Sequence, residues 1–262
     1  MHFFITKLLA TPVMICAAYL AGQRWGSAAS GILIGLPLVS GLVSVFLACE
    51  QGPEFSARAA AGTMAGQISL CLYSLVFCAV GQKAGCLVSS CAAMAAFLVS
   101  TWVLRLVDWP LIPAFFGLMF VLALVLKLIP VYPVQAPADP APRWDLPARI
   151  VVATGFVLAL TGLAGMLGPQ LSGLIAPFPV LSTVFAVFIH VQQGPKVMSN
   201  FLRGMVLGIA GNGAFFLVIG GLLPRLGIAA AYLLASGLAV LINVAFIRGL
   251  GKSREHGPDL AD

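Results

Sequence analysis

Residues 26–66 read GSAASGILIGLPLVSGLVSVFLACEQGPEFSARAAAGTMAG, and this stretch recurs later in the chain. Moved forward by 142 positions, it aligns without a gap on residues 168–208, and twelve of its 41 positions are identical. The identities include Pro37/Pro179, a shared Gln-Gly-Pro tripeptide and several glycines. Chance matching in an apolar sequence would align Leu and Val, but it would not align prolines and glycines at one offset. The sequence therefore predicts an internal duplication.

The composition is that of a membrane protein. Hydrophobic residues make up 61% of the chain and charged residues 8%, with a mean hydropathy of +1.06. Soluble proteins carry roughly a quarter charged residues, and several apolar runs here approach the ~20 residues that a helix needs to cross a bilayer. The net charge of +6 comes from scattered Lys and Arg rather than a basic patch. We therefore expect a membrane-embedded helical bundle that binds no nucleic acid.

The motifs of catalytic and metal-binding proteins do not occur in the sequence. The six cysteines all lie in the first half, without a Cys-x-x-Cys pair. There is no phosphate loop, no nucleophile elbow and no pair of carboxylates spaced for acid–base catalysis. We therefore expect no metal, no cofactor and no catalytic residue, and we predict that the chain is not an enzyme.

The apolar runs predict an all-α polytopic membrane protein with about nine transmembrane helices. We place these helices at 3–22, 28–49, 57–80, 84–105, 110–131, 147–167, 171–191, 201–222 and 226–247. A proline-rich linker at 132–144 favours extended structure. The predicted domains are a first four-span repeat at 1–108, a linker span and proline-rich loop at 109–146, a second four-span repeat at 147–250, and a cytoplasmic tail at 251–262.

The span count predicts that the two repeats are inverted. Five crossings separate equivalent positions in the second and seventh spans, and an odd number places them on opposite sides of the membrane. The fifth span would then return the chain between the repeats. Ten of the 14 Lys and Arg residues fall on one side, so the positive-inside rule places the C-terminus in the cytoplasm and the N-terminus outside a bacterial-type inner membrane.

Proline and glycine interrupt the second and seventh spans at equivalent places. A proline inside a helix removes a backbone hydrogen bond, and irregular backbone at membrane depth is tolerated only against protein or a polar cavity. Paired interruptions of this kind are the best sequence indication of a transport site; alternatively, they only shape packing. The predicted substrate-binding residues are Gly35, Pro37, Ser40, Pro177, Pro179, Ser182, Thr183 and Asn212.

Two ionisable residues lie near the ends of these interrupted spans. Glu50 and His190 could couple transport to a proton or an ion, because ionisable groups near a membrane are costly and often functional. Alternatively, both residues reach headgroups or water. Glycines four apart at Gly62/Gly66 and Gly204/Gly208 predict close helix packing, with the third and eighth spans near a pseudo-twofold axis.

The second half resembles the small inner-membrane proteins of the GlpM type. The resemblance rests on Ser172-Gly-Leu-Ile-Ala-Pro-Phe-Pro179, on the polar span end with His190, and on Phe201-Leu-Arg203. Those proteins are single four-span units associated with alginate biosynthesis, and this chain looks like two such units fused. It departs from them by a Gln-Gly-Pro before the eighth span and by Ala48 at the first-half position of His190. The resemblance implies no catalytic residue.

We therefore expect an inner-membrane secondary transporter that moves a small solute by alternating access between the inverted repeats. A restarted helix with its positive dipole end directed inward favours an anionic solute, and a lipid-like molecule is the other substrate class. The alternative is a non-transporting scaffold or assembly partner in envelope polysaccharide biosynthesis. The expected partners are membrane lipid and a small-molecule solute. The sequence leaves open whether the chain also forms a homo-oligomer or binds an envelope-biosynthesis partner.

Overall fold

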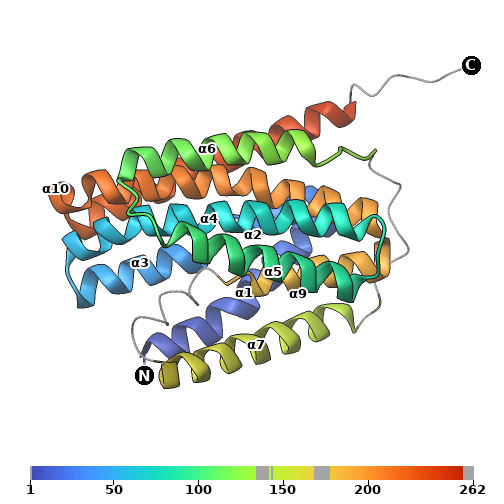
Figure 1. Ribbon diagram of the computed structural model, residues 1–262, viewed down its shortest axis with the longest axis horizontal. Helices are drawn as coiled ribbons and strands as arrows, with labels where there is room; N and C mark the ends of the chain where they lie inside the picture. Colours follow the sequence, from blue (N-terminus) through green and yellow to red (C-terminus); the bar gives the residue numbers. More distant parts are fainter. Residues whose placement is uncertain (1, 134–141, 143, 168–177, 256–262) are drawn as a thin grey trace, which may run out of the picture.

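The structure is a helical bundle. The computed structural model describes residues 2–133, 142, 144–167 and 178–255, and all regular secondary structure in these ranges is helical. Figure 1 shows most helices running along the long axis of the molecule. The elements are α1 (His2–Trp25), α2 (Ser27–Ile34), α3 (Leu38–Glu50), α4 (Pro53–Gly81), α5 (Cys86–Leu104), α6 (Leu111–Leu128), α7 (Asp145–Leu167), α9 (Val180–Gln193) and α10 (Pro195–Glu255).

Four of the described helices, α4, α5, α6 and α10, are long and apolar enough to cross a membrane. The outer helices also expose large apolar side chains, such as Trp102 on α5 and Phe116 and Phe120 on α6. Such a surface is costly in water and suits a hydrocarbon environment. The predicted all-helical fold is confirmed, and its apolar helices are compatible with a membrane protein. The count of nine spans stays a prediction.

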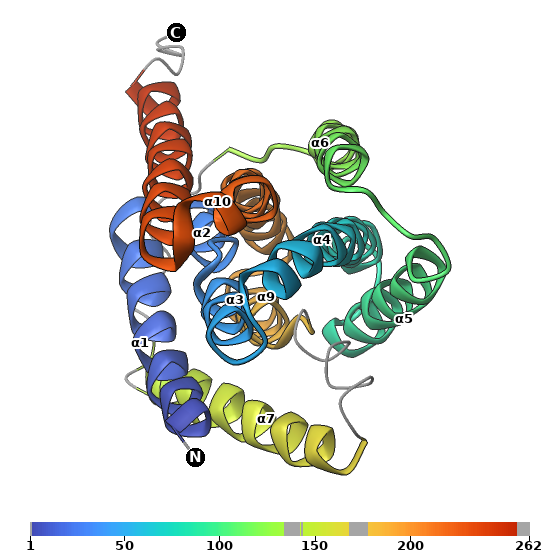
Figure 2. The same cartoon turned by 90° about the vertical axis from the view of Figure 1, so that its left-hand side faces the viewer.

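The helices form a central group and an outer group. Figure 2 shows α2, α3, α4, α9 and the first part of α10 in the middle, with α1, α5, α6 and α7 around them. α10 is not one straight helix, because Gly227 has a φ of 75° and breaks it. Gly227 is the second residue of the last span that we predicted, at 226–247.

Pro37 and Pro179, which align under the shift of 142 positions, each stand directly before a helix. α2 ends at Ile34, and Pro37 caps the N-terminus of α3 with φ −73° and ψ 38°. Pro179 caps the N-terminus of α9 with φ −77° and ψ 51°. Both prolines therefore adopt nearly the same non-helical conformation, and each starts a helix that runs to a Gln-Gly-Pro sequence.

The Gln-Gly-Pro sequences end one helix and start the next. Gly52 and Gly194 have φ values of 94° and 86°, a backbone conformation that residues with a Cβ atom rarely adopt. Pro53 and Pro195 are then the first residues of α4 and α10, where a proline needs no backbone N–H donor. The predicted helix stop is confirmed at both positions.

α4 and the first part of α10 pack against each other and run in opposite directions. At the C-terminal end of α4, Gln82 Nε2 donates a 2.9 Å hydrogen bond to Ser199 Oγ, near the start of α10. Near the start of α4, Ala57 and Ala61 line one pocket together with Gly220 and Pro224 of α10. The ends of the two helices are thus paired head to tail.

Gly204 and Gly208 of α10 pack against α2, which is not the helix that we predicted for them. A methyl group on Gly31 of α2 would lie 2.6 Å from the backbone nitrogen of Met205, and one on Gly35 would lie 2.8 Å from the Cα atom of Gly208. A methyl group on Gly204 would meet the backbone of Ala28. These glycines therefore bring α2 onto α10, whereas we expected them to act at the contact between the third and eighth spans.

Candidate functional site

The first break lies between α2 and α3, against α10. Gly35 is buried at the C-terminal end of α2, and Pro37 and Ser40 are half-buried at the start of α3. Gly41 follows them and faces Phe215, because a methyl group on Gly41 would lie 3.3 Å from the Phe215 ring. The predicted residues of the first half therefore lie together, next to the central helix α10.

The second break that we predicted lies at the start of α9, and the described residues include only its part from Phe178 onward. Pro179 and Ser182 are buried there, and Thr183 is half-buried. Thr183 Oγ1 donates a 2.7 Å hydrogen bond to the Pro179 carbonyl. The hydroxyl of Tyr73 on α4 lies 2.9 Å from the same Oγ1 atom, so Tyr73 donates and Thr183 accepts. The predicted Pro177 lies outside the described residues.

The two breaks are packed in the same way, each by the other half of the chain. Gly41 and Thr183 are equivalent under the shift of 142 positions, and so are Tyr73 and Phe215. Phe215 from the second half packs on Gly41, and Tyr73 from the first half bonds to Thr183. Each of these contacts thus joins one half of the chain to the other at equivalent positions.

Asn212 is buried in α10 beside the first break. It lies one turn beyond Gly208, which contacts Gly35, and one turn before Phe215, which contacts Gly41. Its Oδ1 atom has no hydrogen-bond partner. A buried amide oxygen without a partner carries a desolvation cost of about 1–3 kcal/mol, so this position favours a polar contact that the described residues do not supply.

Two further buried amides lie in α4 and α10. Both polar atoms of Gln67 on α4 lack a partner, as does Oδ1 of Asn243 on α10. Asn243 Nδ2 lies against Gly211 and donates a 2.8 Å hydrogen bond to the Ala239 carbonyl. Gln67 was not among the residues that we predicted for the site, although a glutamine within an apolar run is a signal that could have identified it.

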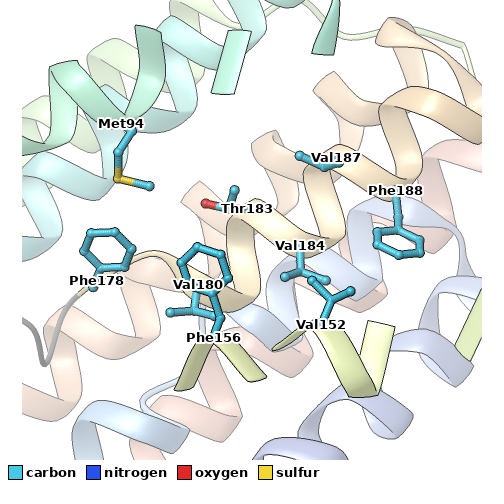
Figure 3. A pocket seen from close by; sticks show the side chains of 9 residues that line it. All are labelled: Met94, Val152, Phe156, Phe178, Val180, Thr183, Val184, Val187 and Phe188. Atoms are coloured by element: carbon cyan, nitrogen blue, oxygen red, sulfur yellow. The ribbon is translucent and has the colours of Figure 1, made fainter. Parts of the chain in front are cut away.

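An apolar pocket of about 180 Å³ opens beside the second break (Figure 3). It lies on α9, with walls from α5 and α7. Thr183 is the one lining residue with a hydroxyl, and that hydroxyl is already bonded to Tyr73 and Pro179. The lining residues are Met94, Val152, Phe156, Phe178, Val180, Thr183, Val184, Val187 and Phe188. A ligand in this pocket would gain burial of apolar surface rather than hydrogen bonds.

The two predicted coupling residues have different surroundings. Glu50 is exposed at the end of α3, so it does not lie in the interior of the bundle. His190 is half-buried on α9 and packs edge-on against Phe77, with ring centroids 6.2 Å apart. Its Nδ1 atom is buried without a hydrogen-bond partner.

The structure also contains a buried ion pair that we did not predict. Arg149 Nε donates a 3.0 Å hydrogen bond to Asp145 Oδ1 on α7, and the two side chains are 3% and 1% exposed. Gln192 Nε2 of α9 donates to the same oxygen at 2.7 Å. From the sequence, Arg149 counts among the ten basic residues that we place on one side of the membrane, and it aligns with Lys7 under the shift of 142 positions. An acid and a base four residues apart at the start of an apolar run are the signal that could have identified the pair.

Aromatic rings surround the guanidinium of Arg149. Tyr19 of α1 lies with its ring centroid 5.7 Å from the guanidinium carbon, and Phe185 and Phe188 of α9 lie at 4.9 and 5.0 Å. These distances are within the range of cation–π attraction. The site therefore joins α1, α7 and α9 at one end of the bundle.

A chain of hydroxyl groups joins α3, α4 and α10. Ser44 Oγ lies 2.7 Å from the Tyr232 hydroxyl and 3.0 Å from Ser56 Oγ. Ser56 donates in turn to the Ser44 carbonyl at 2.9 Å. Every hydroxyl in this group has a partner, so the group acts as a structural connection and not as an open site.

No protein-family model matches the sequence, and no curated protein and no solved structure matches it either. Within the described ranges, no three or more His, Cys, Asp or Glu side chains are grouped as they would be to hold a metal ion. The functional interpretation therefore rests on the geometry of the two breaks, the pocket and the buried polar groups.

Proposed function

We propose that the chain is an inner-membrane carrier that works by alternating access between two inverted repeats. The observation that carries the proposal is the exchanged packing at the two breaks, where Tyr73 meets Thr183 and Phe215 meets Gly41. A twofold relation between broken helices is the architecture of several secondary transporter families. The breaks supply irregular backbone at the places where the two repeats meet.

The directions of the helices support the inversion. α4 and the first part of α10 are equivalent under the duplication, and they run antiparallel, with Gln82 beside Ser199. Two equivalent helices that cross a membrane in opposite directions belong to repeats of opposite topology. A rocking motion of one repeat against the other would then expose the breaks to each side in turn.

The pocket favours a lipid-like substrate over a small hydrophilic one. Its walls are apolar, and its one hydroxyl group, on Thr183, is already paired. Near the first break, the unpartnered Oδ1 of Asn212 is a hydrogen-bond acceptor on the path between the repeats, separate from the apolar pocket. We assign substrate contact to the two breaks, with Gly35, Pro37, Ser40, Pro179, Ser182 and Thr183 nearest to the path.

The test is the water accessibility of both breaks from both sides of the membrane. Single cysteines would replace Ser40, Ser182 or Thr183 in a cysteine-free background. A membrane-impermeant maleimide would be applied to intact cells and to inverted membrane vesicles. We expect labelling from both sides, because each break should face each side during the cycle.

Two control positions make this result interpretable. Glu54 is exposed at the start of α4 and should label readily, whereas Ile32 is fully buried in α2 and should not. If Ser40, Ser182 and Thr183 behave like Ile32 from both sides, the breaks are packed core and the carrier proposal fails.

The second candidate is a non-transporting scaffold in envelope polysaccharide biosynthesis. One observation favours it: the backbones of α2 and α10 are in direct contact beside the first break, which Gly31 and Gly35 permit. A scaffold needs such a packed interior, and a carrier must open it. Liposomes with purified protein, tested with anionic, neutral and amphiphilic solutes, separate the two, because a scaffold would accelerate the movement of none.

A further inference from the structure

The apolar pocket follows α9 toward the buried ion pair. Its lining begins at Phe178, beside the second break, and ends at Phe188, about three turns along. Figure 3 shows these two rings at opposite ends of the pocket. The lining from Val180 to Phe188 spans about 12 Å of helix at 1.5 Å per residue. The pocket is therefore elongated in the direction of α9.

The far end of the pocket adjoins the ion pair. Phe188 lines the pocket and also lies over the guanidinium of Arg149, with its centroid 5.0 Å away. Val152, another lining residue, is one turn from Arg149 on α7. One aromatic ring thus separates an apolar pocket from a buried positive charge.

The ion pair is incompletely satisfied. Oδ1 of Asp145 accepts hydrogen bonds from both Arg149 and Gln192, whereas Oδ2 is buried without a partner. A buried carboxylate oxygen with no donor is costly. A proton bound at Oδ2 removes that cost, but it leaves Arg149 without a negative partner unless another anion arrives.

We propose that this pocket binds a single-chain anionic amphiphile of the fatty-acid type, with its chain along α9 and its carboxylate on Arg149, while Asp145 takes up one proton. The chain matches the apolar lining, and the Arg149 guanidinium behind the Phe188 ring supplies the complementary charge; the ring turns aside to let the carboxylate reach it. This assignment rests on the proposed carrier function, for which it names the substrate class and the coupling carboxyl.

The exchange conserves charge. The Arg149 Nε–H releases Oδ1 of Asp145 and donates to the carboxylate of the ligand, and a proton from water bonds to Oδ2. The ion pair has zero net charge before binding, and the site with one anion and one added proton also has zero. The other groups near Asp145 are the Tyr19 phenol on α1 and the uncharged Gln192 on α9. His190 lies two residues before Gln192 on α9, and its ring packs against Phe77.

The first experiment uses unmodified protein in nanodiscs of zwitterionic lipid, with empty nanodiscs as the blank. Laurate, dodecanol and acetate are titrated by calorimetry in two buffers with different ionisation enthalpies, which yields the number of protons bound. We expect laurate to bind at least tenfold more tightly than dodecanol or acetate, with about one proton taken up. Equal affinity for laurate and dodecanol, or no proton uptake with laurate, overturns the proposal.

Variants then assign the two roles. Arg149→Gln should weaken laurate binding at least tenfold and leave dodecanol binding unchanged, and Arg149→Lys should restore part of the loss. Asp145→Asn should abolish the proton uptake. The matched control is the exposed pair Glu54 and Arg58, which has the same four-residue spacing, and Arg58→Gln should change neither quantity. Unchanged laurate binding in folded Arg149→Gln contradicts the proposed site.

Two further measurements distinguish the class of anionic ligand, and distinguish failure of the binding site from failure of the carrier function. Lysophosphatidylglycerol carries one chain and an anionic phosphate, so its binding relative to laurate distinguishes a lipid head group from a free carboxylate. Laurate binding without accelerated movement in liposomes would refute the carrier function and leave the binding site in place. Movement of other solutes without laurate binding would refute this assignment and leave the carrier function in place.

Discussion

The hydroxyl of Tyr73 on α4 donates a 2.9 Å hydrogen bond to Oγ1 of Thr183 on α9. This bond joins the first half of the chain to the first turn of α9 in the second half. Its counterpart is an apolar contact between Phe215 and Gly41. The contact thus lies at the same position in the two halves, but it is polar in one and apolar in the other. The hydroxyl of Tyr73 can therefore be removed while its aromatic ring is kept.

Replacing Tyr73 by Phe should therefore lower the free energy of unfolding by about 1 kcal/mol, the net contribution of one hydrogen bond. The Phe side chain already occupies the equivalent position at Phe215, so the packing should persist. A double-mutant cycle with Thr183→Val, measured by reversible unfolding in mixed micelles, should give a coupling energy of similar size. A coupling energy near zero would show that the bond contributes nothing to stability.

Gly31→Ala should strongly destabilise the protein. Its added methyl group would lie 2.6 Å from the backbone nitrogen of Met205, which cannot move as a flexible side chain can. Overpacking of this kind costs about 1–3 kcal/mol. Gly237→Ala is the matched control, because it is exposed on α10 with open space around it, and alanine there should stabilise the helix by up to about 1 kcal/mol. The same unfolding measurement compares both variants.

Breaking the buried ion pair should cost more than breaking the exposed one. Asp145→Ala leaves the buried Arg149 without its partner, for which a loss of about 3–5 kcal/mol is expected. Glu54→Ala removes an exposed partner of Arg58 at 3.9 Å, and its effect should stay below about 1 kcal/mol. Thermal unfolding in detergent ranks the two variants, and similar midpoints would contradict the importance of the buried pair.

Tyr232→Phe tests the hydroxyl chain between α3, α4 and α10. The substitution removes one partner of Ser44 at 2.7 Å and keeps the ring, which packs on Phe215. We expect a loss of about 1–2 kcal/mol, because Ser44 is left with fewer partners in a buried place. Ser56→Ala should lower stability by a similar amount, and the two effects should not add.

The local features of the fold could be predicted from the sequence. Pro37 and Pro179 cannot donate a backbone hydrogen bond, so they break the helix wherever they fall inside an apolar run. Gly52 and Gly194 adopt positive φ because they lack a Cβ. These effects depend on one residue and its immediate neighbours. In the described residues, the structure shows the break at Pro37, the start of α9 after Pro179, and the positive φ at both glycines.

The contacts across the bundle could not be predicted in this way. The small-residue spacing at Gly204 and Gly208 indicates close packing but not its partner, which is α2. Likewise, nothing near Tyr73 in the sequence indicates Thr183, and the sequence around Arg149 does not show that rings from α1 and α9 surround it.

The sequence by itself determined the helical, apolar character of the chain and the positions where α3, α4, α9 and α10 begin, because these follow from composition and from the backbone chemistry of proline and glycine. Only the tertiary structure decided which helices pack against each helix start and which side chains surround each buried charge. Pro37 and Pro179 start equivalent helices by local chemistry, whereas Asp145 and Arg149 become a buried site only because α1 and α9 pack over α7 and exclude solvent.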